Sequence, residues 1–205
     1  MTHDADWILP DWPAPARVGS LVTTRRGGSS RGVFASLNLG DHVGDDPAAV
    51  AANRESVCRR IGLRPVWLRQ VHGLRVIDAA LDAGPYPPEA DAAFTRQAGV
   101  ACAVMTADCL PVLFCDAAGT VAAAAHAGWR GLLAGVLEAT VAAMDVPGGE
   151  LMAWLGPAIG PQAFEVGDEV REAFAAADAD AARAFQPASD GKWLADIYQL
   201  ARQRL

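Results

Sequence analysis

The fold of this chain is decided by residues 106–130, TADCLPVLFCDAAGTVAAAAHAGWR. Two apolar runs in this stretch predict two buried strands, and the segment Asp116-Ala117-Ala118-Gly119 between them predicts a short hairpin loop. A symmetric hairpin around this loop places residue 115 opposite residue 120, and therefore places Cys109 directly opposite His126. The stretch thus predicts a polar pair where an otherwise apolar hairpin ends.

Directly opposed residues of an antiparallel pair point to the same face, with Cβ atoms about 4.5–5.5 Å apart. Pro111 has no N–H and therefore favours a non-hydrogen-bonded pair of the ladder. Hydrogen-bonded and non-hydrogen-bonded pairs alternate, so the Cys109–His126 pair is also non-hydrogen-bonded, and in such pairs the side chains approach most closely. A bulge would shift the register by one residue and send the two side chains to opposite faces. In the symmetric register, Cys109 and His126 could share a metal ion or form a Cys–His dyad.

Length and composition predict one globular domain. The chain has 205 residues, 52% of them hydrophobic, which is enough to bury a sizeable core. The net charge of −7 argues against nucleic acid or an anionic membrane surface as the main partner. Neither a membrane span nor a signal peptide is recognisable, so we expect a cytoplasmic protein with four free cysteines and no zinc knuckle of the CxxC type.

The rest of the chain alternates between predicted strands and helices. Asp46 as N-cap, Pro47 at the first helical position and Gly62 as a stop predict a helix that ends near Ile61. The other predicted elements are an extended lead-in over residues 1–20, strands over 67–72, 91–95 and 151–155, and helices over 132–144, 166–180 and 193–204. This mixture predicts an α/β or α+β sandwich.

Two of the four histidines end predicted strands beside glycine turns, His72 before Gly73 and His126 before Ala127-Gly128. With Cys109 they form a Cys/His₂ set, and three protein ligands with an open fourth position are typical of a catalytic zinc site. An equally weighted alternative is that both histidines cap strands and Cys109 is a small core residue. Asp108 turns to the other face unless the strand ends there, and could instead orient a ligand from behind it.

Arg25, Arg69 and Arg130 each lie beside a glycine-rich turn. In an acidic chain, three such guanidinium groups would provide fixed positive charge for an anion. Arg130 also lies near a predicted helix start, where backbone N–H groups favour phosphate. The alternative for each arginine is an ordinary solvated surface position. The Gly27-Gly28 loop lacks the GxxxxGK and GxGxxG patterns of nucleotide-binding loops.

Segments between about residues 20 and 170 resemble, in order, the YfiH-like family, also called the laccase-domain or polyphenol oxidase family and described as purine nucleoside phosphorylases. These segments are Thr23-Thr24-Arg25 with its Gly-Gly-Ser loop, Ser36-Leu37-Asn38-Leu39, His42-Val43-Gly44-Asp45-Asp46, Asn53-Arg54, Gln70-Val71-His72-Gly73, Ala107-Asp108-Cys109-Leu110-Pro111, His126-Ala127-Gly128-Trp129-Arg130-Gly131 and Leu155-Gly156-Pro157-Ala158-Ile159-Gly160.

The resemblance implies a fold and a metal centre. The fold is α+β, a multilayer sandwich of mixed β-sheets flanked by helices, related to the Cys–His deamidase toxins (CNF/YfiH-like). The metal ligands and catalytic residues are His72, Cys109 and His126. Zinc is the expected metal, with copper as the alternative. Family members usually continue past the position of Leu205, so we expect residues 1–205 to be a single YfiH-like domain that lacks the family's C-terminal segment.

The resemblance also implies two reactions of purine nucleosides. Inorganic phosphate, held by Arg25, would attack the anomeric carbon of adenosine, inosine, guanosine or methylthioadenosine, and a water activated at the metal would deaminate adenosine at C6. The candidates for ribose or base contacts are Asn38, Gln70 and Asp108, and those for further anion contacts are Arg69 and Arg130. We expect a monomer or a weak homo-oligomer, with neither nucleic acid nor membrane as partner.

Three other functions stay open at this stage. Cys109 could be a nucleophile activated by His126 in a metal-free amidase or deamidase. A copper-dependent, laccase-like polyphenol oxidase is less favoured, because multicopper chemistry needs many more histidines than the four in this chain. The third alternative is a non-catalytic partner in cell-wall metabolism.

Overall fold

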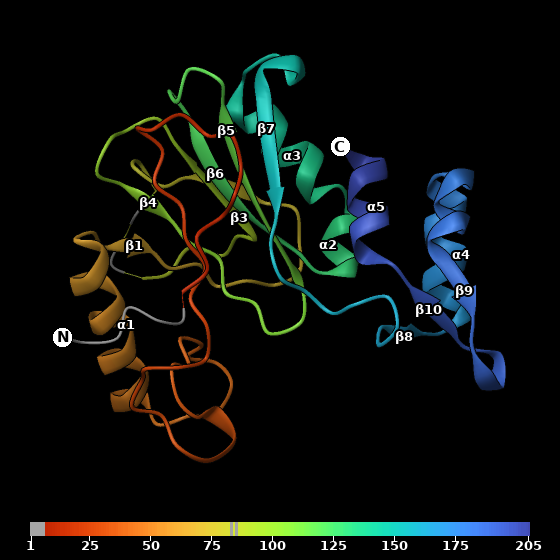
Figure 1. Cartoon of the computed structure of the whole chain (residues 1–205), viewed down its shortest axis with the longest axis horizontal. Helices are drawn as coiled ribbons and strands as arrows, with labels where there is room; N and C mark the ends of the chain where they lie inside the picture. Colours follow the sequence, from red (N-terminus) through yellow and green to blue (C-terminus); the bar gives the residue numbers. More distant parts are fainter. Residues whose placement is uncertain (1–6, 83, 85) are drawn as a thin grey trace.

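A central five-stranded mixed sheet organises the molecule (Figure 1). The computed structural model describes residues 7–82, 84 and 86–205. The strand order is β2-β3-β6-β5-β7, in which β2 and β3 are parallel and the other neighbours antiparallel. The bounds are β2 Val76–Asp78, β3 Ala92–Thr95, β5 Leu110–Asp116, β6 Ala122–Ala127 and β7 Leu151–Leu155. The predicted hairpin and the predicted strands at 91–95 and 151–155 are therefore confirmed.

The register of the β5–β6 hairpin differs by two residues from the prediction. His126 lies opposite Pro111, not Cys109, and Ala127 lies opposite Leu110. The turn is longer than the symmetric hairpin assumed, because the carboxylate of Asp116 accepts hydrogen bonds from the backbone N–H groups of Thr120 and Val121 and holds both residues in the connection. A shift of two residues preserves the face, so the expectation that Cys109 and His126 share a face holds although direct opposition was wrong.

Pro111 occupies a position where its missing N–H leaves the β5–β6 ladder intact. Its carbonyl accepts from the N–H of Gly156 at 2.8 Å, on the β7 side, and the N–H of His126 donates to the carbonyl of Asp91 at 2.7 Å, on the β3 side. The Pro111–His126 pair is therefore non-hydrogen-bonded, the class that the sequence predicted for this proline.

Helices cover one face of the sheet. The helices α2 (Trp129–Ala134) and α3 (Val136–Met144) pack against it, and α5 (Ile197–Arg204) packs against both of them (Figure 1). Leu110, Val112 and Phe114 point into this layer and are almost completely buried. The single helix predicted over 132–144 is wrong, because Gly135 adopts a left-handed φ of 104° that ends α2 and starts α3.

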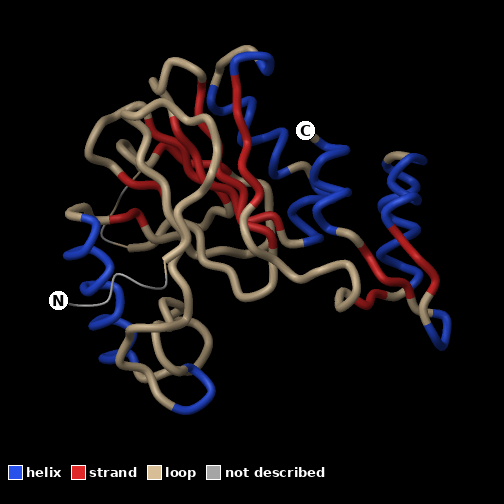
Figure 2. Tube along the Cα trace, in the orientation of Figure 1, coloured by secondary structure: helices blue, strands red, loops and turns tan. Residues whose placement is uncertain are grey.

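The opposite face carries a thinner layer. A parallel pair, β1 (Pro65–Val66) and β4 (Ala101–Cys102), lies there, and the apolar cluster beneath it includes Leu68, Ile77 and Ala93. The helix α1 (Pro47–Ile61) has the predicted bounds: Asp46 caps the N–H of Ala48, and Gly62 ends the helix with a φ of 71°. The strand predicted over 67–72 is wrong, because most of these residues form a loop (Figure 2).

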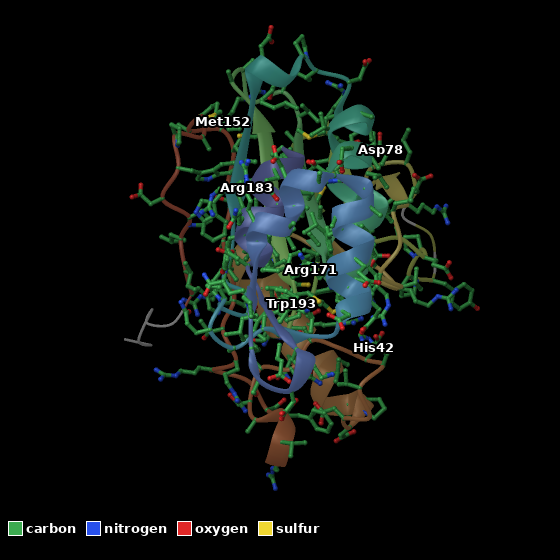
Figure 3. The ribbon with its side chains drawn as sticks, turned by 90° about the vertical axis from the view of Figure 1, so that its right-hand side faces the viewer. His42, Asp78, Met152, Arg171, Arg183 and Trp193 are labelled. Atoms are coloured by element: carbon green, nitrogen blue, oxygen red, sulfur yellow. The ribbon has the colours of Figure 1, made fainter. Side chains whose placement is uncertain are left out.

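The C-terminal part adds a small antiparallel sheet, ordered β8-β10-β9, and the helix α4 (Asp168–Ala177). Its strands are β8 Glu165–Val166, β9 Phe185–Pro187 and β10 Trp193–Ala195. The described residues also form 3₁₀ turns at Gly32–Phe34, Gly148–Glu150, Ala179–Ala184 and Ser189–Gly191. Trp193 ties β10 to α4: its indole N–H donates to Asp168 at 2.6 Å, and the guanidinium of Arg171 lies 4.2 Å from its ring (Figure 3). The helix α4 is shorter than the one predicted over 166–180. The helix α5 is shorter than the one predicted over 193–204, because β10 occupies Trp193–Ala195.

These layers make a multilayer α+β sandwich, as expected. The predicted lead-in over residues 1–20 forms one antiparallel bridge, Ile8 with Val22, and residues 1–6 lie outside the described part of the chain. Within the described ranges, every helix is too short or too polar to cross a lipid bilayer.

Asn53 in α1 binds the loop that contains Gly27 and Gly28 and the residues that follow it. Its side chain is 1% exposed. Its carbonyl oxygen accepts the backbone N–H of Ser29 at 2.7 Å, and its amide nitrogen donates to the carbonyls of Ser36 and Asn38 at 3.2 and 2.8 Å. The loop therefore obtains hydrogen bonds that it does not form within itself.

The variant Asn53→Ala should lower the free energy of unfolding by about 2–4 kcal/mol, because it removes the hydrogen bonds of a buried amide to three backbone groups of the loop. Urea unfolding followed by circular dichroism measures this change, with Gln97→Ala on the exposed surface as the control. A loss equal to that of the control would mean that Asn53 does not hold the loop.

Candidate metal centre

His126 lies at the end of β6 with its ring buried and fixed by Asp91. The two side chains meet at 2.9 Å, between Nδ1 of His126 and Oδ1 of Asp91. Asp91 immediately precedes β3, the neighbour of β6, so the strand pairing itself brings the two residues together. This contact directs the other ring nitrogen, Nε2, away from Asp91 and towards Cys109 and His72.

The same carboxylate binds the turn that carries His72. It accepts three successive backbone N–H groups, those of Val71, His72 and Gly73, at 3.1, 2.9 and 2.8 Å. His72 has a left-handed φ of 59°, and such a turn points consecutive N–H groups into one concave nest for an anion. Asp91 therefore fixes both histidines at once.

The charges of the site are coupled. Burial favours the neutral form of Asp91, but the hydrogen bonds from His126 and the three amides outweigh it and hold the pKa of Asp91 below its ordinary value. Burial also opposes charge on His126, yet Asp91 and the thiol of Cys109 raise the pKa of His126 to about 9. Desolvation and the positive charge of His126 lower the pKa of His72, which favours the neutral imidazole that binds metals.

Cys109 completes a group of three ligand atoms. It lies in the bend before β5, with Sγ 4.0 Å from Nε2 of His72, and the candidate ligand atoms of His72, Cys109 and His126 all lie within 4.8 Å of one another. Tetrahedral zinc with the usual bond lengths of about 2.3 Å to sulfur and 2.0–2.1 Å to nitrogen separates the two ligands by about 3.6 Å. The Cys109–His72 pair therefore fits a zinc-sized ion after a contraction of a few tenths of an ångström, and the widest pair of the group, up to 4.8 Å apart, would have to close by about 1 Å.

Gly128 lets the thiol and the imidazole approach each other. A Cβ at this position would lie 2.8 Å from Sγ of Cys109 and 2.9 Å from Cδ2 of His72. The backbone of Gly128, with φ −64° and ψ 157°, is open to any residue, so the lack of space alone demands glycine.

The predicted arginines have different surroundings. Arg25 is exposed, and its Nε donates to the carbonyl of Ala35 in its own loop. Arg69 forms an ion pair with Glu89. Arg130 stacks its guanidinium 4.3 Å from the ring of Trp129, and its charge contributes to the lowered pKa of His72. Arg130 is thus the arginine with an electrostatic connection to the metal centre. Arg130 is the second residue of α2, which has only six residues.

Two of the three residues predicted to contact the ribose or the base form hydrogen bonds within the protein instead. The side chain of Asn38 bonds with Gly40 and Asp45. Both ends of the Gln70 amide bond with the backbone of Met105. Asp108 precedes the first residue of β5, so strand alternation does not apply to it, and its side chain is exposed. Asp91, rather than Asp108, orients a candidate metal ligand, because it contacts Nδ1 of His126.

Sequence reasoning missed Asp91. The available signal was an acidic residue directly before an apolar strand, which is a common strand boundary. Its function depends on contacts with residues 18 to 35 positions away, and no local spacing shows them.

Comparisons with known proteins agree with the fold. The family model for the multi-copper polyphenol oxidoreductase laccase matches residues 19–205. A Pseudomonas aeruginosa protein named purine nucleoside phosphorylase is 61% identical over 97% of this chain and 81% of its own length. An Escherichia coli protein of the same name is 57% identical, with shares of 97% and 82%.

Solved structures of two similar proteins have the same fold. A Neisseria meningitidis protein superposes with a TM-score of 0.94 at 56% identity, over 97% of this chain and 81% of that one. The protein YlmD of Geobacillus stearothermophilus superposes with a TM-score of 0.85 at 29% identity, over 100% and 82% of the two chains.

The variant Asp91→Asn should weaken zinc binding by about 10–100-fold, because the amide removes the charge behind His126 and turns an N–H₂ group towards donors. Competition with a chromophoric chelator measures the affinity, and Asp11→Asn on the exposed surface is the control. In the metal-free protein, the pKa of His126 should fall below about 9 in an NMR titration. Unchanged zinc affinity would show that Asp91 does not organise the centre.

The variant Gly128→Ala should also weaken zinc binding, by about tenfold or more, because the added methyl group separates Cys109 from His72. Gly149→Ala is the matched control, since a Cβ there meets open space. The chelator competition reports the affinity of both variants. If Gly128→Ala binds zinc as tightly as Gly149→Ala, the close approach at Gly128 is irrelevant to the metal centre.

Proposed function

The chain belongs to the multi-copper polyphenol oxidoreductase laccase family, and we propose that it is a metal-dependent purine nucleoside phosphorylase. One observation carries the proposal: His72, Cys109 and His126 converge where β6 ends and β5 begins, with His72 on the exposed side. The names of the relatives that are 57–61% identical supply the substrate class.

We propose zinc as the metal. One thiolate and two imidazoles are ligands that zinc accepts in a tetrahedral site, and three protein ligands leave the fourth position for a substrate or water. When bound there, zinc would supply Lewis-acid polarisation of an oxygen ligand. Asp91 supports this role, because a carboxylate behind a ligating histidine fixes the ring and raises its basicity. Copper also accepts thiolate and imidazole ligands, but a tetrahedral set of them is less typical of copper than of zinc.

In the proposed phosphorolysis, an oxygen of inorganic phosphate attacks the anomeric carbon of the ribose. The bond between that carbon and the purine nitrogen breaks, and the products are ribose 1-phosphate and the free base, which takes up a proton. The exposed guanidinium of Arg25 and that of Arg130 are the proposed phosphate contacts. Arg130 has the stronger support, since its charge acts on His72.

We further propose that methylthioadenosine is a substrate of the same phosphorolysis and that adenosine is also deaminated. In the deamination, water adds to C6 of the purine and ammonia leaves. His72 is the neutral, exposed imidazole of the group, so it is the proposed residue at the substrate side, while His126 stays buried against Asp91. Gln70 and Asn38 are proposed to shape the walls of the site through their bonds to neighbouring loops.

A second candidate is favoured by one feature of the geometry. Cys109, His126 and Asp91 are arranged like a nucleophile, a base and the acid that orients the base, and the pKa of His126 is raised by both neighbours. This arrangement would suit a metal-free amidase or deamidase with Cys109 as nucleophile. A multicopper oxidase is not favoured, because the described residues hold one group of candidate His and Cys ligands rather than several.

The zinc-loaded protein should convert adenosine and phosphate into ribose 1-phosphate with adenine or hypoxanthine, and some adenosine into inosine. His72→Ala should lower both product rates by about 100-fold or more, because it removes a metal ligand. His42→Ala, at another exposed histidine, is the control. Chromatography and a coupled assay for ribose 1-phosphate measure the products.

The same assay separates the two candidates. Absence of all these products from zinc-loaded protein would sink the phosphorylase proposal. Full activity on an amide substrate in the presence of chelator, together with a covalent Cys109 adduct detected by mass spectrometry, would favour the metal-free alternative.

A further inference from the structure

The three candidate ligands are anchored in different ways. His126 belongs to a central strand, and the turn of His72 is bound to the buried carboxylate of Asp91. Cys109 instead ends a segment, residues 103–109, that lies between β4 and β5 and outside both strands. The position of the thiol therefore depends on whatever holds this segment to the His72 turn.

Gln70 provides such a connection. Its Nε2 donates to the carbonyl of Met105 at 2.8 Å, and its Oε1 accepts the N–H of Met105 at 2.7 Å. A side-chain amide thus bonds with a main-chain residue through both its donor and its acceptor, as a neighbouring strand would. Gln70 lies two residues before His72, and Met105 lies four residues before Cys109.

Arg54 holds the side chain of the same residue. Its Nη2 lies 3.6 Å from Sδ of Met105, while its Nε donates to the carbonyl of Leu39 at 2.8 Å and its Nη1 pairs with Asp41 at 3.2 Å. The guanidinium also lies 4.7 Å from the ring of Trp67, three residues before Gln70. Met105 is therefore held through its backbone by Gln70 and through its sulfur by Arg54.

We propose that Gln70 is a positioning residue of the metal centre: through Met105 it sets the distance between the Cys109 thiol and His72. The inference rests on the proposed metal site. The thiol lies 4.0 Å from His72, against about 3.6 Å in a tetrahedral zinc site, so little drift is tolerable. The Gln70 amide, engaged at both ends, then serves the ligand cysteine rather than a nucleoside.

The test compares Gln70→Ala and Gln70→Glu with the wild-type chain, using Co²⁺ as a spectroscopic substitute for zinc. Both variants should bind Co²⁺ about 10–100-fold more weakly and lose intensity in the thiolate-to-cobalt charge-transfer band. Gln70→Glu sets a carboxylate against the carbonyl of Met105 and loses one hydrogen bond. It keeps an acceptor for the N–H of Met105, so its effect should be smaller than that of Gln70→Ala. Gln97→Glu, at an exposed glutamine, is the matched control.

Thermal unfolding of each variant separates positioning from folding. A Co²⁺ band and affinity like those of the control, combined with a raised KM for nucleoside, would overturn the proposal and place the amide on the substrate. A weakened band in a variant that unfolds near the wild-type temperature supports it.

The proposal can also be judged if the wild-type chain binds neither Co²⁺ nor zinc, which would sink the metal-dependent function itself. Hydrogen exchange of the Met105 amide in the metal-free protein then decides. Faster exchange in Gln70→Ala, together with faster alkylation of Cys109, supports the connection through Met105. Exchange and alkylation at wild-type rates overturn it.

Discussion

The structure depends on one buried carboxylate. Asp91 is fully buried, and an isolated charge in such a place would be strongly unfavourable. It is stabilised by His126 from one side and by three backbone N–H groups of the His72 turn from the other. Because these partners come from a strand and a distant turn, folding that satisfies Asp91 also assembles two thirds of the candidate metal centre. The left-handed backbone of His72 is tolerated because the carboxylate holds it.

The electrostatics of the centre explain why two chemistries fit it. Asp91 occupies Nδ1 of His126, so the proton that the raised pKa of about 9 retains is on Nε2, facing the thiol. A metal ion would replace that proton at the same atom. A protonated His126 can hydrogen-bond to the sulfur of Cys109, and a metal ion can bind the same sulfur as a ligand. The same three residues are therefore prepared for either partner.

The sequence predicted those features that depend on neighbouring residues. Asp46, Pro47 and Gly62 determined α1, and the apolar runs around residue 117 determined the hairpin with its shared face. The register was wrong by two residues because Asp116 binds Thr120 and Val121, a contact that the apolar pattern does not encode. His72 was a candidate because it ends a predicted strand beside a glycine turn, and the family resemblance supported it as a ligand; its turn reaches the other ligands only by way of Asp91. Asp91 itself was missed because its partners are remote in sequence.

The alanine strand β6 gives the centre its rigidity. Alanine loses little side-chain entropy on folding, and small side chains let the helix layer and the β4 layer pack closely on both faces of the strand. His126 is the large side chain in this strand, so a tightly packed sheet fixes its backbone. Cys109 lacks that support, because it precedes β5 and is placed by Gln70 and Gly128. A centre with two ligands fixed by the buried frame and a third placed by a surface segment can contract around an ion without disturbing the core, which is what a separation of 4.0 Å between thiol and imidazole requires.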